Sequence, residues 1–381
     1  MESRTVKLGD IADITTGKTP SKRIENAYGN VIKFLTPRDF NGRFSVTTER
    51  MLSDQGYQAV HNKVVSGPSV SVTCIGSDMG KVIYNRESVV TNQQVNTLSN
   101  FKSNTDPLFL YYLLSTKKKE LLNYGAGNGS TMPIITKSMF SQLEIKLPSV
   151  KVQRKLVACL NPLDDKIELN RQINKNLLRL AKQQFNLTFP NVYEGNSRLS
   201  NVMENFDRKR IPLARKEREK RQSVYRYVGA TSVLDYVDDY LFDGTYLLMG
   251  EDGTVQDEKG FPILQYIWGK FWPNNHTHVL RGTFVSTEWL YLFLMNTNVR
   301  SRITGAVQQK ISQANMNSIP LTIPSKDELF RFQKQIEPVF SQIQLLDEQT
   351  LKLTAIHKLL LPKLLAGQID LSNLEGAIQN A

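Results

Sequence analysis

A seven-residue stretch near the middle of the chain recurs close to its end. Residues 143–149 read LEIKLPS and residues 319–325 read IPLTIPS, so apolar residues coincide at the first, third and fifth positions and both copies end in Pro-Ser. Apolar residues at alternate positions are typical of a strand with one buried face. Each copy therefore predicts a strand that a proline ends, with differing residues such as Glu144 and Lys146 toward solvent.

The repeat continues downstream at the same spacing of 176 positions, through two long segments whose apolar residues follow heptad spacing. This spacing keeps one stripe of a helix against a partner helix. Asn170 and Asn174 interrupt the first stripe, where they either fix the register of the helices or face solvent. Pro162 and Pro338 predict a kink or a restart, because proline removes an amide donor. The predicted helix–helix interface comprises Leu156, Leu160, Leu163, Ile167, Asn170, Asn174, Leu177, Ile336, Val339, Ile343, Leu346, Leu353 and Leu360.

Upstream the repeat is looser but keeps its order. VKLGDIADITTGKTPS (6–21) has a counterpart in SRLSNVMENFDRKRIPLA (197–214), and TNQQVNTL (91–98) has one in NNHTHVL (274–280). Segments rich in β-branched residues alternate with a short apolar helix in each half. The predicted fold is α/β, of the mixed α+β kind: two similar globular domains separated by two long helices, an internal duplication with pseudo-two-fold symmetry.

The same pattern sets the expected domain boundaries, with a polar connection at 190–205 and a short helix at 107–125 of the first body. The five segments are a first globular domain, a helical region, a second globular domain, a second helical region and a flexible tail, at residues 1–148, 149–190, 191–324, 325–372 and 373–381.

Composition narrows the class of partner. The 381 residues carry a net charge of +12, which favours a polyanion, and nucleic acid is the commonest one. The two cysteines, Cys74 and Cys159, suit a reducing compartment. No secretory signal and no apolar run near the ~18 residues of a membrane span is visible, so a cytoplasmic location without membrane contact is expected.

Basic and amide side chains give the candidate DNA contacts. Residues 208–222, RKRIPLARKEREKRQ, hold eight basic and two acidic residues, which either grip phosphates or form a solvated helix face. Amides such as those of Asn92 and Asn274 either read base edges or cap turns. The candidates are Lys18, Lys22, Arg23, Arg38 (beside Asp39), Asn92, Gln93, Gln94, Arg208, Lys209, Arg210, Arg215, Lys216, Asn274, Asn275 and His276.

Motifs for chemistry are weak throughout the sequence. GAGNGS (125–130) breaks the dinucleotide-loop pattern at Ser130 and follows a helix, whereas that pattern requires a strand. His276 and His278 share a strand face, but zinc needs further ligands that the remaining histidines and cysteines do not supply at a suitable spacing. The sequence therefore predicts no catalytic, cofactor-binding or metal-binding residues in this chain.

The ordered motifs resemble a known family. VKLGDIADITTGKTPS, GSDMGKV, TNQQVN and LPSVKVQRKL resemble the first half of the specificity subunit of type I restriction-modification systems, and GKFWPNNHTHVL with LLLPKLLAGQI is similar to its second half. The resemblance covers nearly all of residues 4–372. Its specificity comes from the order of these motifs, which occurs twice in the chain, and not from any single motif.

The resemblance implies that each globular body is a target recognition domain for one half of a bipartite double-stranded DNA target. It also implies that the long helices pack antiparallel, set the spacer and dock two modification (methyltransferase) subunits, which restriction (translocase and nuclease) subunits can join. S-adenosylmethionine, ATP and Mg are then expected in those partners, and the specificity subunit itself is not an enzyme. Two rival interpretations stay open: a self-contained methyltransferase or nuclease with unrecognised motifs, and a coiled-coil scaffold that does not bind DNA.

Overall fold

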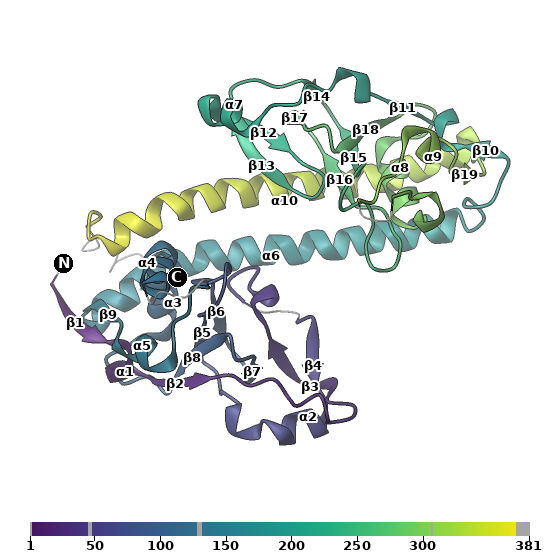
Figure 1. Ribbon diagram of the computed structural model, residues 1–381. Helices are drawn as coiled ribbons and strands as arrows, with labels where there is room; N and C mark the ends of the chain where they lie inside the picture. The colour runs from purple at the N-terminus through teal and green to yellow at the C-terminus, as the bar shows by residue number, and fades with distance from the viewer. Residues whose placement is uncertain (1, 45–47, 128–131, 306–307, 371–381) are drawn as a thin grey trace. The chain divides into compact units, whose positions relative to one another are not determined.

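The computed structural model describes residues 2–44, 48–127, 132–305 and 308–370 (Figure 1). The chain forms two compact units, residues 1–168 with 351–381 and residues 169–350. The expected tail at 373–381 and the second half of GAGNGS, residues 128–130, lie outside the described residues. Among the described residues, no helix combines the length and apolarity that crossing a membrane requires.

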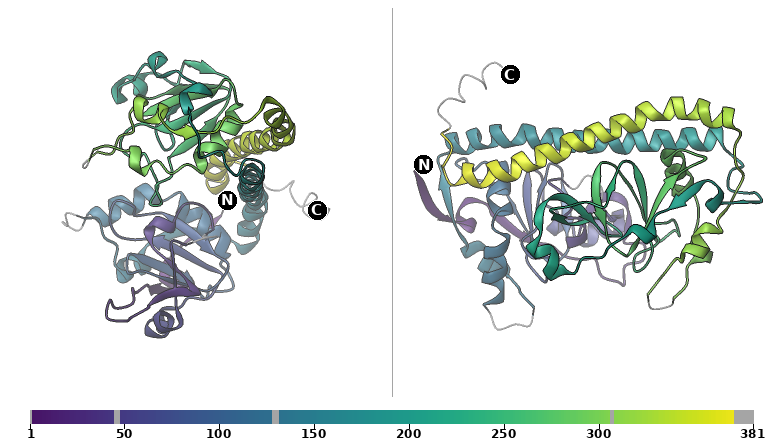
Figure 2. Two further views of the ribbon diagram at one scale, coloured as in Figure 1. Left: turned by 90° about the vertical axis from the view of Figure 1, so that its right-hand side faces the viewer. Right: turned by 90° about the horizontal axis from the view of Figure 1, so that it is seen from above.

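Two long helices, α6 (Val150–Thr188) and α10 (Lys326–Leu365), each contribute one part to each unit. Pro162 and Pro338 lie inside these helices, so neither proline causes the restart that the sequence suggested. Each unit therefore contains its own stretch of paired helix, which Figure 2 shows from two further sides.

Apolar residues hold each body to its part of the helix pair. In the first unit, Leu156 and Leu160 of α6 and Leu361 and Leu364 of α10 belong to the main core of the body. In the second unit, the core includes residues of both helices, and the ring of Phe185 lies 5.3 Å from that of Trp289 and 5.7 Å from that of Phe332, measured between centroids. Burial of such apolar area is the main stabilising term for both bodies.

Polar contacts fix the same attachments. The buried Arg43 pairs with Asp165 of α6 at 3.3 Å, and the Tyr112 hydroxyl donates to Asp164 at 2.8 Å. In the second unit, Trp268 Nε1 donates to Glu348 of α10 at 3.1 Å. Because these partners are far apart in sequence, each body is bound to its helices by specific pairs as well as by apolar packing.

The first body is built on two small sheets. One has the order β2-β8-β5-β6 and the other the order β4-β3-β7, in which β3 and β7 run parallel. The strands are β2 (Asp13–Thr16), β3 (Tyr28–Leu35), β4 (Arg50–Leu52), β5 (Ser69–Thr73), β6 (Val82–Asn85), β7 (Val89–Thr91) and β8 (Val95–Ser99). The helices are α1 (Leu8–Ile11), α2 (Asp54–Ala59), α3 (Pro107–Ser115), α4 (Lys118–Ala126) and α5 (Lys137–Gln142).

The second body repeats this plan. Its sheets have the orders β11-β18-β15-β16 and β13-β12-β17-β14, and β12 runs parallel to β17. The strands are β11 (Met203–Asn205), β12 (Gln222–Val228), β13 (Val233–Val237), β14 (Phe242–Asp243), β15 (Tyr246–Gly250), β16 (Leu264–Ile267), β17 (Lys270–Pro273) and β18 (Thr277–Gly282). The helices are α7 (Arg215–Lys220), α8 (Thr287–Met295) and α9 (Gln313–Asn317).

The repeated LEIKLPS and IPLTIPS stretches form β9 (Glu144–Pro148) and β19 (Pro320–Leu321). They pair antiparallel with β1 (Ser3–Lys7) and β10 (Ser197–Arg198), respectively. Ile145 and Leu321 are buried, whereas Glu144, Lys146, Pro320 and Thr322 are exposed, so the predicted faces are confirmed. In each unit this pair of strands joins the beginning of the body to the start of a long helix.

Two details of the expected bodies are wrong. The helix expected at 107–125 is two helices, because Ser115 and Thr116 cap the end of α3 by bonding their hydroxyls to carbonyls one turn back. The stretch 190–205, expected as a connection, already contains β10 and β11, and Leu199 and Val202 are fully buried. The polar residues of this stretch lie between buried core residues, so its polarity alone suggested a connection.

Candidate nucleic-acid interface

The same turn occurs once in each body, between the last strand of the parallel pair and the next strand. The Asn92 amide oxygen accepts from the Gln94 backbone N–H at 3.1 Å, and the Asn274 amide oxygen accepts from the His276 backbone N–H at 3.0 Å. The backbone N–H of Asn92 donates to Leu35, and that of Asn274 donates to Val228. Both asparagines are buried, so of the two roles foreseen for them the structure shows turn capping.

The turn in the first body displays the side chains that follow Asn92. Gln93 is exposed, and its amide oxygen accepts from the Thr19 hydroxyl at 2.7 Å. The backbone N–H of Lys18 donates to Thr91, so the exposed loop carrying Lys18, Lys22 and Arg23 starts beside this turn. The sequence candidates at 18 and 93 therefore lie together, at one end of the sheet.

Gln94 and Arg38 share a hollow on the same body. Arg38 lies on the short turn Pro37–Asp39 and its side chain is largely exposed. Its neighbour Asp39 is buried and acidic, and its carboxylate accepts from the backbone N–H groups of Thr36 and Glu49, both at 2.7 Å. The residue that can carry a positive charge to DNA at this bend is therefore Arg38.

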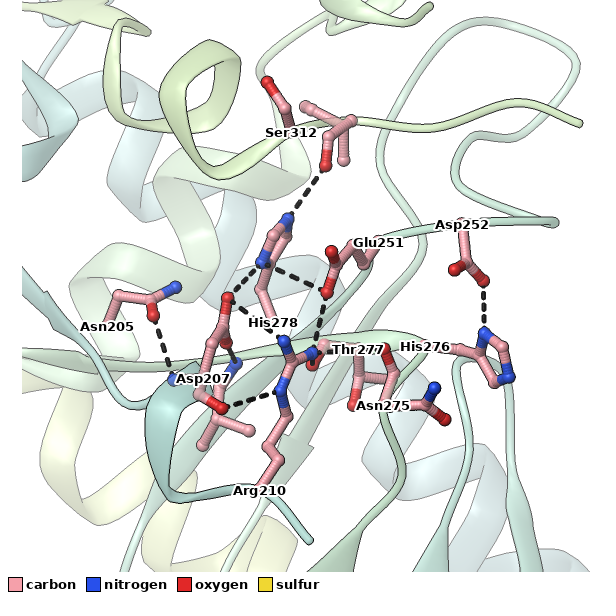
Figure 3. A network of polar contacts seen from close by, with 12 residues as sticks. Asn205, Asp207, Arg210, Glu251, Asp252, Asn275, His276, Thr277, His278 and Ser312 are labelled. Carbon is pink, nitrogen blue, oxygen red and sulfur yellow. Dashed lines mark hydrogen bonds and ion pairs between the residues drawn. The ribbon is translucent and has the colours of Figure 1, made fainter. Parts of the chain in front are cut away.

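The equivalent turn in the second body leads into a buried network of charged groups (Figure 3). His278 lies four residues after Asn274 and is fully buried on β18. Its Nδ1 lies 2.6 Å from the Asp207 carboxylate and its Nε2 lies 2.9 Å from the Ile311 carbonyl oxygen. Arg210 donates to Glu251 at 2.7 Å, and Lys310 pairs with the other oxygen of Glu251 at 3.3 Å.

The hydrogen bonds fix which groups in this network carry protons. A carbonyl oxygen only accepts, so His278 Nε2 donates to Ile311. Burial acts to raise the pKa of the Asp207 carboxyl, but the hydrogen bond and charge of His278 and the Val279 amide together lower it. The ionised Asp207 therefore accepts from Nδ1 of His278.

The first body has a neutral group at the equivalent place. Asn96 lies four residues after Asn92, accepts from the Thr16 hydroxyl at 2.6 Å, and donates to the Ile135 carbonyl at 3.4 Å. The backbone N–H of Ile135 donates to Cys74, as that of Ile311 donates to Glu251. Thr16, Cys74 and Asn96 thus correspond to Asp207, Glu251 and His278. Burial raises the pKa of the Cys74 thiol to about 12, so this group carries no charge near neutral pH.

The basic segment 208–222 is largely committed to its own domain. Arg210 is mostly buried and also donates to the backbone carbonyl of Thr277. Arg218 pairs with Asp235 at 3.4 Å, and Arg221 pairs with Asp238 at 2.7 Å. Of the candidates, Arg208, Lys209, Arg215 and Lys216 are exposed, although Arg215 also pairs with Glu219 at 3.0 Å. Asn275 and His276 are exposed as well, and His276 pairs with Asp252.

The predicted helix-interface residues are all buried or half-buried. In the second unit, the Asn170 side chain donates to Gln349 at 2.8 Å, and that of Asn174 donates to the Ile343 carbonyl at 3.1 Å and to Asp347 at 2.8 Å. Because the later residue of α6 meets the earlier residues of α10, the two helices run antiparallel there. Both asparagines bridge the helices, as a register-fixing role requires.

Asp207, Glu251 and His278 have ligand atoms within 4.8 Å of one another, the spacing that a metal ion could use. The two carboxylates, however, already have cationic partners in Arg210 and Lys310, and both nitrogens of His278 are bonded. This arrangement suits an internal ion-pair network. Sequence analysis missed the network because its acidic members lie 71 and 27 residues before His278, and only the shared position of Asn96 and His278 in the repeat points to it.

Comparison with known proteins gives a consistent picture. A model of the type I restriction modification DNA specificity domain matches residues 2–179 and again residues 193–355. A type I restriction enzyme specificity subunit (MjaIX) of Methanocaldococcus jannaschii is 23% identical, over 97% of this chain and 94% of its own length. A putative type I restriction enzyme specificity subunit of Haemophilus influenzae is 36% identical over a quarter of each chain. The solved S subunit of a type I restriction-modification system from M. genitalium has the same fold, with a TM-score of 0.57, 15% identity and 96% of each chain covered.

Proposed function

Because this chain belongs to the family of type I restriction modification DNA specificity domains and carries that domain twice, we propose that each target recognition domain reads one half of a split sequence in double-stranded DNA. The observation that carries the proposal is the turn at Asn92 and Asn274. The two domains hold the same turn in the same frame, yet they present Gln93 and Gln94 in one case and Asn275 and His276 in the other. The same backbone turn with different exposed side chains suits two domains that recognise different half-sites.

The chemistry of methyl transfer belongs to partners in this proposal. Two modification subunits, which bring S-adenosylmethionine, dock on the helix pair, and restriction subunits with ATP and Mg can join them. Exposed apolar side chains on the helices, such as Leu180, Leu187, Phe330 and Leu359, support a docking role because a solvated helix rarely keeps so many. The chain itself supplies sequence choice and no catalytic group.

Binding measurements test the DNA part of the proposal directly. We expect the full chain, with its modification subunit, to bind duplex DNA with an affinity that falls on the order of 10³-fold between 50 and 200 mM salt, because several phosphates are neutralised. Fluorescence anisotropy with labelled duplexes measures this. Salt-independent binding or none would favour a scaffold that does not touch DNA. Methyl transfer by the chain alone, without the modification subunit, would contradict the non-catalytic role.

The helices offer a test of how the spacer is set. Each long helix is continuous across the boundary between the two units, and α6, with 39 residues, is roughly 58 Å long. Inserting four residues between Asn170 and Asn174, with four more in the facing 343–350 segment, lengthens the pair by about 6 Å. We expect the spacer of the methylated sites to grow by about two base pairs with both half-sites unchanged. Substituting four residues at the same places without changing the length is the matched control, and an unchanged spacer would refute the role of the helices.

A further inference from the structure

An open hollow of about 480 Å³ lies on the first target recognition domain. Five segments that are far apart in sequence line it: the turn after β3, the start of β4, the β5–β6 connection, the turn before β8, and Met132 ahead of α5. They contribute the donors Arg38, Arg50, Ser77 and Gln94. The acidic Glu49 and Asp78 also line the hollow, where Glu49 pairs with Arg38 and Asp78 pairs with Lys81 at 2.8 Å. Gln93, next to Gln94, is exposed and accepts a hydrogen bond from Thr19. The hollow therefore lies beside the loop that carries Lys18.

The hollow presents hydrogen-bond donors whose own partners are weak. The Arg38 side chain is 81% exposed, and its ion pair with Glu49, which is itself exposed, spans 3.8 Å. Arg50 lies over the ring of Tyr28, with 5.2 Å between the guanidinium carbon and the ring centroid, which keeps its extended side chain in place. The Gln94 amide oxygen accepts from Asn92 at 2.9 Å, so the orientation of this amide is fixed and its NH₂ group can donate outward.

The second domain has different chemistry at the corresponding positions. Gln94 corresponds to His276, which pairs with Asp252. Leu35 and Val228 accept the equivalent hydrogen bonds from the two turn asparagines, so Arg38 corresponds to Thr231, three residues further on. An arginine and an amide in one domain are therefore matched by a threonine and a histidine–aspartate pair in the other. The backbone positions are equivalent and the side chains differ. This is what two domains need in order to recognise two different half-sites.

We propose that this hollow is the base-reading surface of the first domain and that Arg38 reads a guanine there. The inference rests on the proposed function and assigns one of its two reading surfaces. A guanidinium can donate two parallel hydrogen bonds to N7 and O6 of guanine in the major groove, the commonest specific contact in protein–DNA complexes. Gln94 donates to an acceptor on the neighbouring base pair, and Arg50 meets the adjacent phosphate.

Guanine analogues test the assignment in the complete complex with its modification subunit. The target sequence is first read from methylated genomic sites, and each guanine of a duplex carrying it is then replaced by 7-deazaguanine, which removes the N7 acceptor. We expect one replacement in one half-site to weaken binding by the wild-type complex roughly 10-fold. The complex with Arg38→Ala should bind more weakly and be indifferent to that same replacement.

Two further variants keep the outcome decisive. Arg38→Lys retains the charge but not the planar pair of donors, so it should keep phosphate-driven affinity and show a smaller loss of binding with 7-deazaguanine than the wild type. Lys102→Ala, which removes an exposed charge beyond the other end of β8, should keep the wild-type sensitivity intact. If Arg38→Ala and Arg38→Lys stay as sensitive to 7-deazaguanine as the wild type, the base-reading role of Arg38 is wrong while the split target stands. If the wild-type complex recognises no split sequence, the proposed function itself fails.

Discussion

Replacing residues 197–318 with the matching segment of a relative is expected to change one half of the DNA target and to leave the other half and the spacer unchanged. The segment runs from the start of β10 to the end of α9 and contains every exposed candidate contact of the second domain. The first half-site is read by the first unit, whose core is formed by residues outside this segment. We expect methylation at the original second half-site to be lost entirely, because the exchanged domain recognises a different sequence.

The replacement must preserve the attachment of the domain to its helices. Trp289 lies inside the exchanged segment and packs on Phe185 and Phe189, which lie outside it. Loss of a buried aromatic side chain costs about 3–5 kcal/mol, so the donor segment has to supply an equivalent ring. A control exchange that restores the original segment should restore the original target. A change in both half-sites would show that the two domains do not read independently.

Asp207→Ala is expected to destabilise the second domain by about 3 kcal/mol or more, because it removes the carboxylate that the buried His278 contacts at 2.6 Å and leaves Arg210 with Glu251 alone of its two carboxylate partners. The Val279 backbone N–H also loses its acceptor. Urea denaturation followed by tryptophan fluorescence measures this loss in one domain, since all three tryptophans, Trp268, Trp272 and Trp289, belong to the second unit. An effect below about 1 kcal/mol would show that the network contributes little to stability.

The first domain supplies the matched control for this variant. Thr16→Ala removes the equivalent neutral partner of Asn96, so it should cost only about 1 kcal/mol and leave the tryptophan-detected transition unchanged. The pH dependence gives a second control. The folded-state pKa of Asp207 is lower than its usual value near 3.9, so its contribution is complete above about pH 4 and is lost as pH falls through the folded-state value. The difference between wild type and Asp207→Ala should therefore shrink below pH 4.

The duplication is the part of the fold that local sequence patterns reveal. Ile145 and Leu321 repeat an alternating pattern, and Leu160 and Ile336 repeat a heptad pattern, so strand and helix follow from periodicity alone. The sequence also indicates that Asn92 and Asn274 occupy equivalent positions, and in the structure their amides cap turns. These features depend on residues close together in the chain, where propensity and spacing are informative.

The remaining features depend on partners that are distant in sequence. The parallel pairings of β3 with β7 and of β12 with β17 join strands separated by whole hairpins, and no local pattern specifies them. The basic segment 208–222 was interpreted by its charge, but Asp235, Asp238 and Glu251, which bind its arginines, come from later strands and loops. The hollow at Arg38 likewise needs five segments to meet, so its lining became visible only in the folded chain.

Sequencing of methylated bases in cells that express the modification subunit, with and without this chain, tests the central claim most directly. With the chain present, methylation should fall at a single sequence made of two short specified halves and a spacer of fixed length. With the chain absent, those sites should be unmodified. Methylation that persists without the chain, or that falls at one continuous sequence, would contradict a specificity subunit with two reading domains.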